Sequence, residues 1–314
     1  SSLIRGNTIS ENLISGIFIG YTDDSVIIEE NMIEGNVKHG IDCENSSTRI
    51  EHSSINSNGC AGIRYRNGSP TIECNVISGN QGDGDSGGGI LCDWFGTSGR
   101  VLIIGNLIEG NSSYSGGGIS CYSARDNSPI ITHNSIRNNS AALGGGIYCD
   151  WGSSPLIFNN LICGNQATDA GGGLFCEDLC SPTLLNNTIA GNTAQNGPAG
   201  IFSYAMHSLV VKDNILWGNT SVAGPGDQLL PDYGEITFNC IQDWSNGGNS
   251  NISADPMLVD GPLGAYYLDP SSPCIDAGSQ SAEDASLSEM TTQADGTPDT
   301  GTVDMGFHYP VPEE

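Results

Sequence analysis

The sequence has few basic residues and no long apolar run. Only nine of its 314 residues are lysine or arginine, against 36 aspartates and glutamates, which gives a formal net charge of −27. A chain this acidic is repelled by phosphate backbones and by anionic membrane surfaces. Its longest apolar runs, such as 101–104, fall far short of the roughly 20 residues that a membrane-spanning helix needs. We therefore expect neither a nucleic-acid partner nor a membrane span.

Long amphipathic stretches are also lacking, and this argues against helical repeats. Hydrophobic residues make up 37% of the chain and 44 glycines add to them, while only 14% of residues are charged. This composition is ordinary for a folded globular protein and differs from that of a disordered chain. A fold built from short strands and tight corners is what remains.

A short phrase, Asn-x-Ile-x-x-Asn, recurs along most of the chain. Successive copies begin 22 to 31 residues apart. Complete copies begin at Asn7, Asn31, Asn75, Asn106, Asn134, Asn160 and Asn187, variants begin at Ser53 and Asn214, and a degraded copy begins at Asn239. Self-similarity at a period of this size is the signature of a solenoid.

Two further phrases lie between the copies. One is a glycine run followed by Ile-x-Cys or Leu-x-Cys, at residues 87–92, 116–121, 144–149 and 171–176. The other opens each unit with β-branched or aliphatic residues, as at 26–28 and 130–132. Each unit thus has three short segments with the period of two that β-strands show. Glycine and asparagine tolerate left-handed backbone angles, so they mark the corners.

These features predict an all-β fold, a right-handed parallel β-helix of about ten coils. Equivalent isoleucines would stack inside it as an aliphatic ladder. The asparagines at the corners would stack as well, with their amides bonding along the rod. Sequons such as Asn186-Asn187-Thr188 then appear as by-products of this composition.

The pattern changes near residue 250. We expect repeats over 1–250 and a non-repetitive capping segment over 251–314, which would cover the open edges and apolar bore of the last coil. This segment contains the stretches Ala254–Asp260, Ser271–Gly278 and Gly301–Tyr309. These stretches resemble the end of bacterial secreted right-handed β-helix proteins of the choice-of-anchor type, and the repeats resemble the pectin-lyase-like superfamily.

The resemblance implies an exported protein, at the cell surface or in the extracellular matrix. It does not imply one activity, because β-helix relatives include lyases, hydrolases, epimerases and adhesins. No signal peptide is visible at Ser1, so we expect that it has been removed or that this chain is a fragment. No sorting tail follows Glu314, which leaves the mode of anchoring open.

The eleven cysteines are expected to be mainly structural. Five share one position in their coils and should point inward with parallel side-chain vectors, so we expect few or no disulfides among them. They are Cys43, Cys92, Cys121, Cys149 and Cys176. Cys176 and Cys180 form the most plausible local pair. Arg64 should face Asp42 and Arg66 should face Glu44, as ion-pair rungs between neighbouring coils.

The residues that follow the ladder cysteines should point outward. They include Asp93, Tyr122, Asp150 and Glu177, and Asp93-Trp94 and Asp150-Trp151 repeat one dipeptide two coils apart. Three interpretations of this face remain open. It is a solvated acidic surface, a sugar-binding surface using Trp94, Tyr122 and Trp151, or a glycosidase-like carboxylate pair of Asp150 and Glu177 with Asp93 nearby.

Metal and cofactor signals are weak. Asp83 and Asp85, in a glycine-containing loop, have ligand types suited to calcium, but they lack the spacing of a known calcium loop. The five histidines are scattered without metal-ligand spacing, and no other cofactor is indicated.

We therefore predict an exported structural or adhesive protein that contacts glycans or another cell-surface polymer. The first alternative is a polysaccharide-active enzyme, a glycoside hydrolase or lyase. The second is a filament subunit, in which the coil containing Leu3 stacks end to end on a neighbouring molecule.

Overall fold

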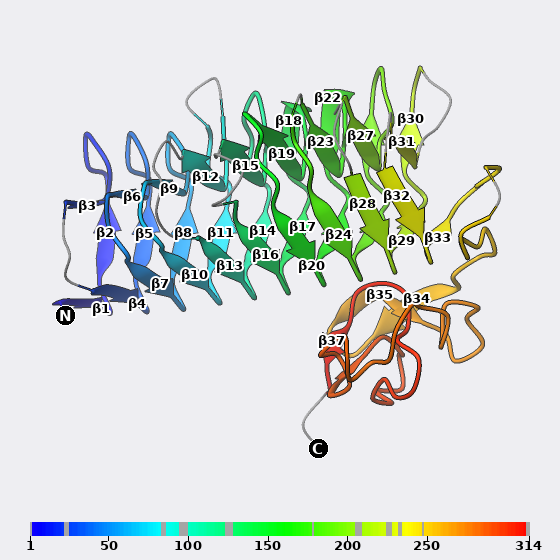
Figure 1. Ribbon diagram of the computed structural model, residues 1–314. Helices are drawn as coiled ribbons and strands as arrows, with labels where there is room; N and C mark the ends of the chain where they lie inside the picture. Colours follow the sequence, from blue (N-terminus) through cyan, green and yellow to red (C-terminus); the bar gives the residue numbers. More distant parts are fainter. Residues whose placement is uncertain are drawn as a thin grey trace.

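The chain winds into a solenoid with an irregular segment beside it (Figure 1). The computed structural model describes residues 2–21, 25–82, 86–93, 100–122, 128–177, 179–204, 209–223, 228–231, 234–246 and 248–311. Every ladder in the solenoid is parallel and joins one coil to the next. None of the described residues is helical, so none belongs to a helix that could span a membrane.

Sheet A collects the first strand of each coil. Among the described residues it has ten strands: β1 (Ser2–Arg5), β4 (Val26–Glu29), β7 (Arg49–Glu51), β10 (Thr71–Glu73), β13 (Leu102–Ile104), β16 (Ile130–Thr132), β20 (Leu156–Phe158), β24 (Thr183–Leu185), β28 (Leu209–Lys212) and β32 (Gly234–Thr237). A left-handed residue directly follows each of these ten strands and turns the chain toward sheet B.

Sheet B collects the second strand, which carries the isoleucine of the repeated phrase. Its ten strands in the described chain are β2 (Thr8–Ser10), β5 (Met32–Glu34), β8 (Ser54–Asn56), β11 (Val76–Ser78), β14 (Leu107–Glu109), β17 (Ser135–Arg137), β21 (Leu161–Cys163), β25 (Thr188–Ala190), β29 (Ile215–Trp217) and β33 (Cys240–Ile241).

Sheet C collects the third strand, and a small sheet D lies on the turn between sheets B and C. Sheet C has nine strands in the described regions: β3 (Ile17–Gly20), β6 (Ile41–Glu44), β9 (Ile63–Arg66), β12 (Ile90–Asp93), β15 (Ile119–Tyr122), β19 (Ile147–Asp150), β23 (Leu174–Cys176), β27 (Ile201–Ser203) and β31 (Leu229–Pro231). Sheet D has β18 (Ser140–Leu143), β22 (Gln166–Ala170), β26 (Thr193–Ala194) and β30 (Thr220–Ser221).

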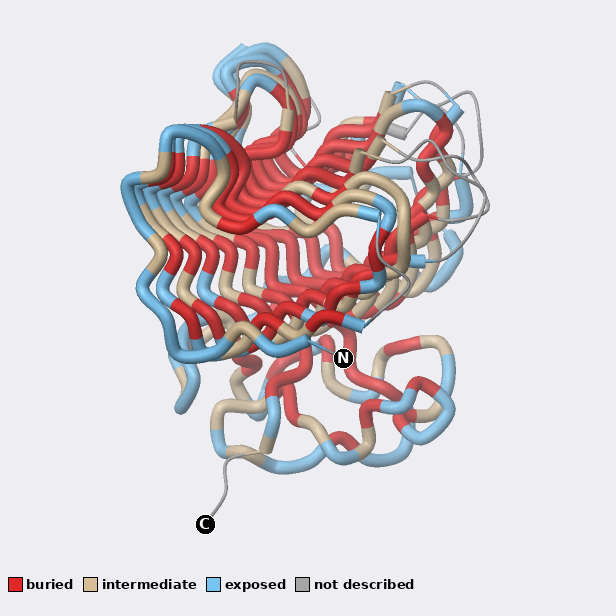
Figure 2. Tube along the Cα trace, turned by 90° about the vertical axis from the view of Figure 1, so that its left-hand side faces the viewer, coloured by how far each residue is buried: buried red, intermediate tan, exposed pale blue. Residues whose placement is uncertain are grey.

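Buried positions recur at the same place in successive coils (Figure 2). In sheet B, Ile77 pairs in register with Ile55 and Ile108, and all three are fully buried. Inward residues of sheets A and C join them in one continuous core. The predicted aliphatic ladder is therefore confirmed.

Two asparagine ladders run along the corners, as predicted. Within the second ladder, the backbone N–H and Nδ2 of Asn139 both donate to Oδ1 of Asn165, each at 3.0 Å. Nδ2 of Asn165 donates in turn to the carbonyl of Ile136 and to Oδ1 of Asn192. Each amide thus bridges neighbouring coils and pairs backbone groups that would otherwise be buried without partners.

The eleven cysteines are all free thiols, and the pair of Cys176 and Cys180 is not bonded. The ladder cysteines pair in register, as with Cys92 on Cys121 and Cys121 on Cys149, and they are fully buried. Burial, together with the neighbouring thiol of Cys121, raises the pKa of Cys92, so this thiol remains a protonated apolar side chain. The fold thus confirms that the ladder cysteines are structural.

The C-terminal segment lies mainly against the flank of the solenoid. It contains two antiparallel pairs, β34 (Leu258–Gly261) with β35 (Gly264–Leu268) and β36 (Met290–Thr291) with β37 (Tyr309–Pro310). Its backbone is anchored to corner residues of sheets A and B in three successive coils (Figure 1). Leu268, Cys274 and Met305 of the segment also pack with Cys240 of the last coil. The expectation that the segment caps the last coil therefore stays a prediction.

Only its beginning continues the stack. Nδ2 of Asn239 donates to Oδ1 of Asn251 at 3.0 Å, and Ile252 forms an isolated parallel β-bridge with Cys240. The remainder folds back, because Asn159, Asn186 and Asp213 offer polar groups on the flank. Asn186 is buried there, and its Nδ2 donates to the carbonyl of Asp304. The sequon that begins at Asn186 is therefore inaccessible to glycosylation while the segment is docked.

Candidate functional site

The outer side of sheet C brings together the acidic residues that the sequence singled out. Tyr122 pairs in register with Asp93 on one side and Asp150 on the other. The backbone N–H of Glu177 donates to the carbonyl of Cys149 at 2.9 Å, which places Glu177 beside Asp150. The row therefore follows the predicted order. Trp94, Asp83 and Asp85 lie outside the described residues.

Asp93 belongs to an ion-pair network at one end of this row. Nε of Arg66 lies 3.3 Å from its carboxylate, and Nη1 of Arg66 donates to Glu44 at 2.7 Å. Arg64 holds Asp42 through two hydrogen bonds of 2.9 Å. The two predicted rungs are confirmed, and the additional contact gives Asp93 a structural partner.

Asp150 is held by its neighbours on the same turn. One carboxylate oxygen accepts from the backbone N–H of Trp151, and the other accepts from the hydroxyl of Tyr148 at 3.3 Å. Burial raises the pKa of Tyr148, and the negative charge of Asp150 acts in the same direction. This phenol therefore remains a hydrogen-bond donor throughout the neutral range.

The spacing of Asp150 and Glu177 suits a carboxylate pair. Neighbouring strands lie about 4.8 Å apart. Carboxyl groups of retaining glycosidases are separated by about 5 to 5.5 Å. Both side chains are half-buried on the outer surface of the sheet. The backbone register thus sets Asp150 and Glu177 one strand spacing apart on the same face.

A ladder of aromatic rings, not expected from the sequence, stands beside the acidic row. Ring centroids of Tyr148 and Phe175 are 5.8 Å apart with an interplanar angle of 19°, and Phe175 and Phe202 are 5.1 Å apart. These residues occupy the x position of the Gly-Ile-x-Cys phrase and its variants, so their spacing is the signal that could have predicted the ladder. Tyr148 and Phe175 are buried, and their rings cover each other's faces. They therefore stabilise this surface and offer little ring area to a ligand.

Beyond the buried rings, a groove of about 170 Å³ opens between sheets C and D. Phe175 and Phe202 form part of its lining, together with Tyr204, which is 59% exposed and packs edge-on against Phe202. On its other side, Nδ2 of Asn196 donates to Oδ1 of Asp169 at 3.1 Å. The groove therefore combines aromatic surface with an exposed carboxylate and amide.

The predicted sugar-contacting residues differ in how much of their ring surface is exposed to solvent. Tyr122 is half-buried and tilts against Tyr148 in the aromatic ladder. Trp151 is 71% exposed at a left-handed position just after β19. Trp151 is therefore available to a ligand, whereas Tyr122 has mainly a packing role.

Within the described part of the chain, no group of three histidine, cysteine or acidic side chains is arranged to hold a metal ion. The calcium hypothesis concerned Asp83 and Asp85, which lie in a segment that the structure does not describe. That hypothesis therefore stays a prediction.

Comparison with known proteins identifies the class. The model of the family described as right handed beta helix region matches residues 1–81 and 75–255. The chain therefore belongs to this family, and its fold is a right-handed parallel β-helix.

One solved structure, titled as the crystal structure of pectate lyase Pel9A, superposes with a TM-score of 0.53 and 13% sequence identity. The match covers 91% of this chain and 76% of that one. At this identity the likeness concerns the fold alone. No curated protein matches the sequence of this chain.

Proposed function

We propose that this protein binds neutral glycans on the outer side of sheet C, as an exported structural or adhesive protein of the cell surface or extracellular matrix. The observation that carries the proposal is the groove in which Tyr204 and Phe202 stand opposite Asp169 and Asn196. Aromatic faces suit the apolar faces of sugar rings, while carboxylates and amides accept and donate hydrogen bonds to hydroxyls.

The charge of the molecule supports a neutral ligand. The formal net charge is −27, and the described lining of the groove includes Asp169 but no lysine or arginine. A uronate polymer would be repelled at this groove, because its described lining has no cation to offset the charge of the uronates. The volume of about 170 Å³ is below the roughly 300 Å³ of pockets for drug-sized ligands. The groove therefore suits one sugar ring of a chain that extends outward.

Calorimetric titration with neutral and uronate oligosaccharides tests this proposal. Tyr204→Ala should weaken binding of a neutral oligosaccharide by about three- to tenfold, the effect of losing one aromatic contact of about 0.5–1.5 kcal/mol. Tyr21→Ala is the matched control, because Tyr21 is exposed and follows β3 at the far end of sheet C. Unchanged affinity in Tyr204→Ala, or preferential binding of uronates, would refute the proposal.

An enzymatic role is the second proposal, and the spacing of Asp150 and Glu177 supports it. A depolymerisation screen on neutral polysaccharides would detect new reducing ends if the pair is catalytic. Asp150→Asn and Glu177→Gln should each abolish that activity while leaving binding at the groove intact. If the screen detects no cleavage, the enzymatic proposal fails and the binding proposal stands.

A further inference from the structure

The second asparagine ladder ends one coil early, and a cavity opens where it stops. The repeated phrase that begins at Asn239 has Trp244 where the other copies have their second asparagine. Asn219 is therefore the last asparagine of this ladder. The amide that would have continued it is missing, and the indole of Trp244 packs against the core instead.

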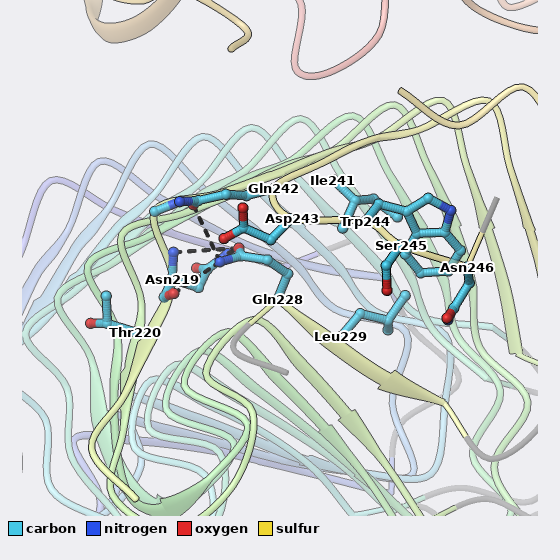
Figure 3. A pocket seen from close by; sticks show the side chains of 11 residues that line it. Asn219, Thr220, Gln228, Leu229, Ile241, Gln242, Asp243, Trp244, Ser245 and Asn246 are labelled. Atoms are coloured by element: carbon cyan, nitrogen blue, oxygen red, sulfur yellow. Dashed lines mark hydrogen bonds between the residues drawn. The ribbon is translucent and has the colours of Figure 1, made fainter. Parts of the chain in front are cut away.

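Two glutamines replace the missing neighbour. Nδ2 of Asn219 donates to Oε1 of Gln228 at 2.7 Å, and Nε2 of Gln228 donates back to the carbonyl of Asn219 at 2.9 Å. Oε1 of Gln242 accepts from the backbone N–H of Gly218 at 2.8 Å and lies 3.4 Å from Nε2 of Gln228. The end of the ladder is thus a fixed cluster of amide groups (Figure 3).

The cluster lines a cavity of about 350 Å³, within the roughly 300–1,000 Å³ range of small-molecule sites. Trp244 and Leu229 supply apolar surface, and Thr220, Asp243 and Ser245 supply polar groups (Figure 3). Nε1 of Trp244 is buried without a hydrogen-bond partner among the described residues.

We infer that this end cavity binds a single neutral sugar unit. Its described lining contains amides, hydroxyls, one carboxylate and an indole, but neither lysine nor arginine. These groups match the alternating hydroxyls and apolar faces of a sugar ring, and they disfavour phosphate or carboxylate ligands. The cavity involves β31, the neighbour of β27, so it lies one coil beyond the groove on sheet C.

Nitrogen-15 NMR of the full chain, titrated with glucose, xylose and galacturonate, tests this inference. The Trp244 indole signal, assigned with Trp244→Phe, and the amide signals of Asn219, Gln228 and Gln242 should move saturably with a neutral sugar. Asp243→Asn should weaken that binding by about three- to tenfold, because a charge-assisted hydrogen bond becomes a neutral one. Asn tolerates the left-handed φ of 58° at this position, so the fold should persist.

Asp169→Asn is the matched control, because it changes the groove on sheet C and should leave the NMR titration unaltered. The inference fails if neither neutral sugar moves these signals, if galacturonate moves them equally, or if Asp243→Asn binds as tightly as the unaltered protein. It also fails if the signals move with protein concentration alone, which would mark association between chain ends. Loss of oligosaccharide binding in Tyr204→Ala with an intact titration at Trp244 would separate the two sites.

Discussion

The solenoid and the C-terminal segment are stabilised in different ways. In the solenoid, each ladder asparagine makes nearly the same bonds to equivalent residues in neighbouring coils. In the segment, each contact occurs once. Asn159 exchanges two hydrogen bonds with the backbone of His308, at 2.7 and 3.0 Å, although the residues are 149 positions apart. The role of a solenoid residue can therefore be inferred from the equivalent residues in other coils, whereas a residue of the segment has no equivalent.

The difference also affects stability. Repeat stability is approximately a sum of nearest-neighbour terms, so damage in one coil weakens the interfaces with the next. The segment is held by polar anchors that each occur once, at Asn159, Asn186, Thr188 and Asp213, and by apolar clusters that it forms with the flank. We therefore expect the segment to detach without unfolding of the solenoid, and three substitutions test this contrast.

The largest effect is expected inside a ladder. Asn165→Ala removes two donated bonds and leaves the N–H and Nδ2 of Asn139 without their acceptor. Each unsatisfied buried group costs about 1–3 kcal/mol, so the free energy of unfolding should fall by at least about 3 kcal/mol. Urea unfolding followed by circular dichroism measures this loss.

Asn12→Ala is its control, because Asn12 is the first member of the same ladder and donates only toward Asn36. We expect it to cost about 1 kcal/mol. Equal losses for the two variants would show that the ladder does not act through neighbouring coils.

A smaller effect, confined to the segment, is expected at its anchor. Asn159→Gly removes both hydrogen bonds to His308 and retains the left-handed φ of 50°. Docking of the segment should weaken by about 2 kcal/mol. Limited proteolysis should then cut within 255–311 faster, while the melting temperature of the solenoid stays constant. Asn138→Gly, at an exposed corner with φ of 54°, should leave the cleavage rate unchanged.

The smallest effect is a pH dependence of docking through Asp213. Burial raises the pKa of this carboxyl, although Ser279 donates to it at 2.7 Å. The docked state then holds more protons than the free state, so docking weakens as pH rises from about 4 through the raised pKa. Asp213→Asn should therefore slow proteolysis of the segment at neutral pH and change little in acid.

Its control is Asp243→Asn, which also lies at a left-handed position but is exposed. Proteolysis rates measured from acidic to neutral pH should retain their dependence in this variant. If the proteolysis rate depends on pH equally in both variants, Asp213 is not the group that causes the pH dependence.

The sequence predicted the solenoid well because its rules are local. Asn-x-Ile-x-x-Asn defines a strand, a corner and two ladders in one phrase, and the alternation in Ile-x-Cys correctly placed Cys149 inside and Asp150 outside. The rungs of Arg64 and Arg66 followed from the same register. The groove was not predicted, because it requires Asp169 of sheet D and Asn196, which follows β26, beside Phe202 of sheet C.

What the sequence by itself determined is the coil: its strands, its corners, its acidic surface and the order of residues along each face. Stacking at a fixed spacing turns that periodicity directly into structure. Only the tertiary structure decided where the C-terminal segment docks, which aromatic rings remain open and how a cavity forms at Trp244. Docking of the segment depends on contacts between residues far apart in the chain, for which no repeated pattern exists. The cavity forms where the repeat itself is interrupted at Trp244.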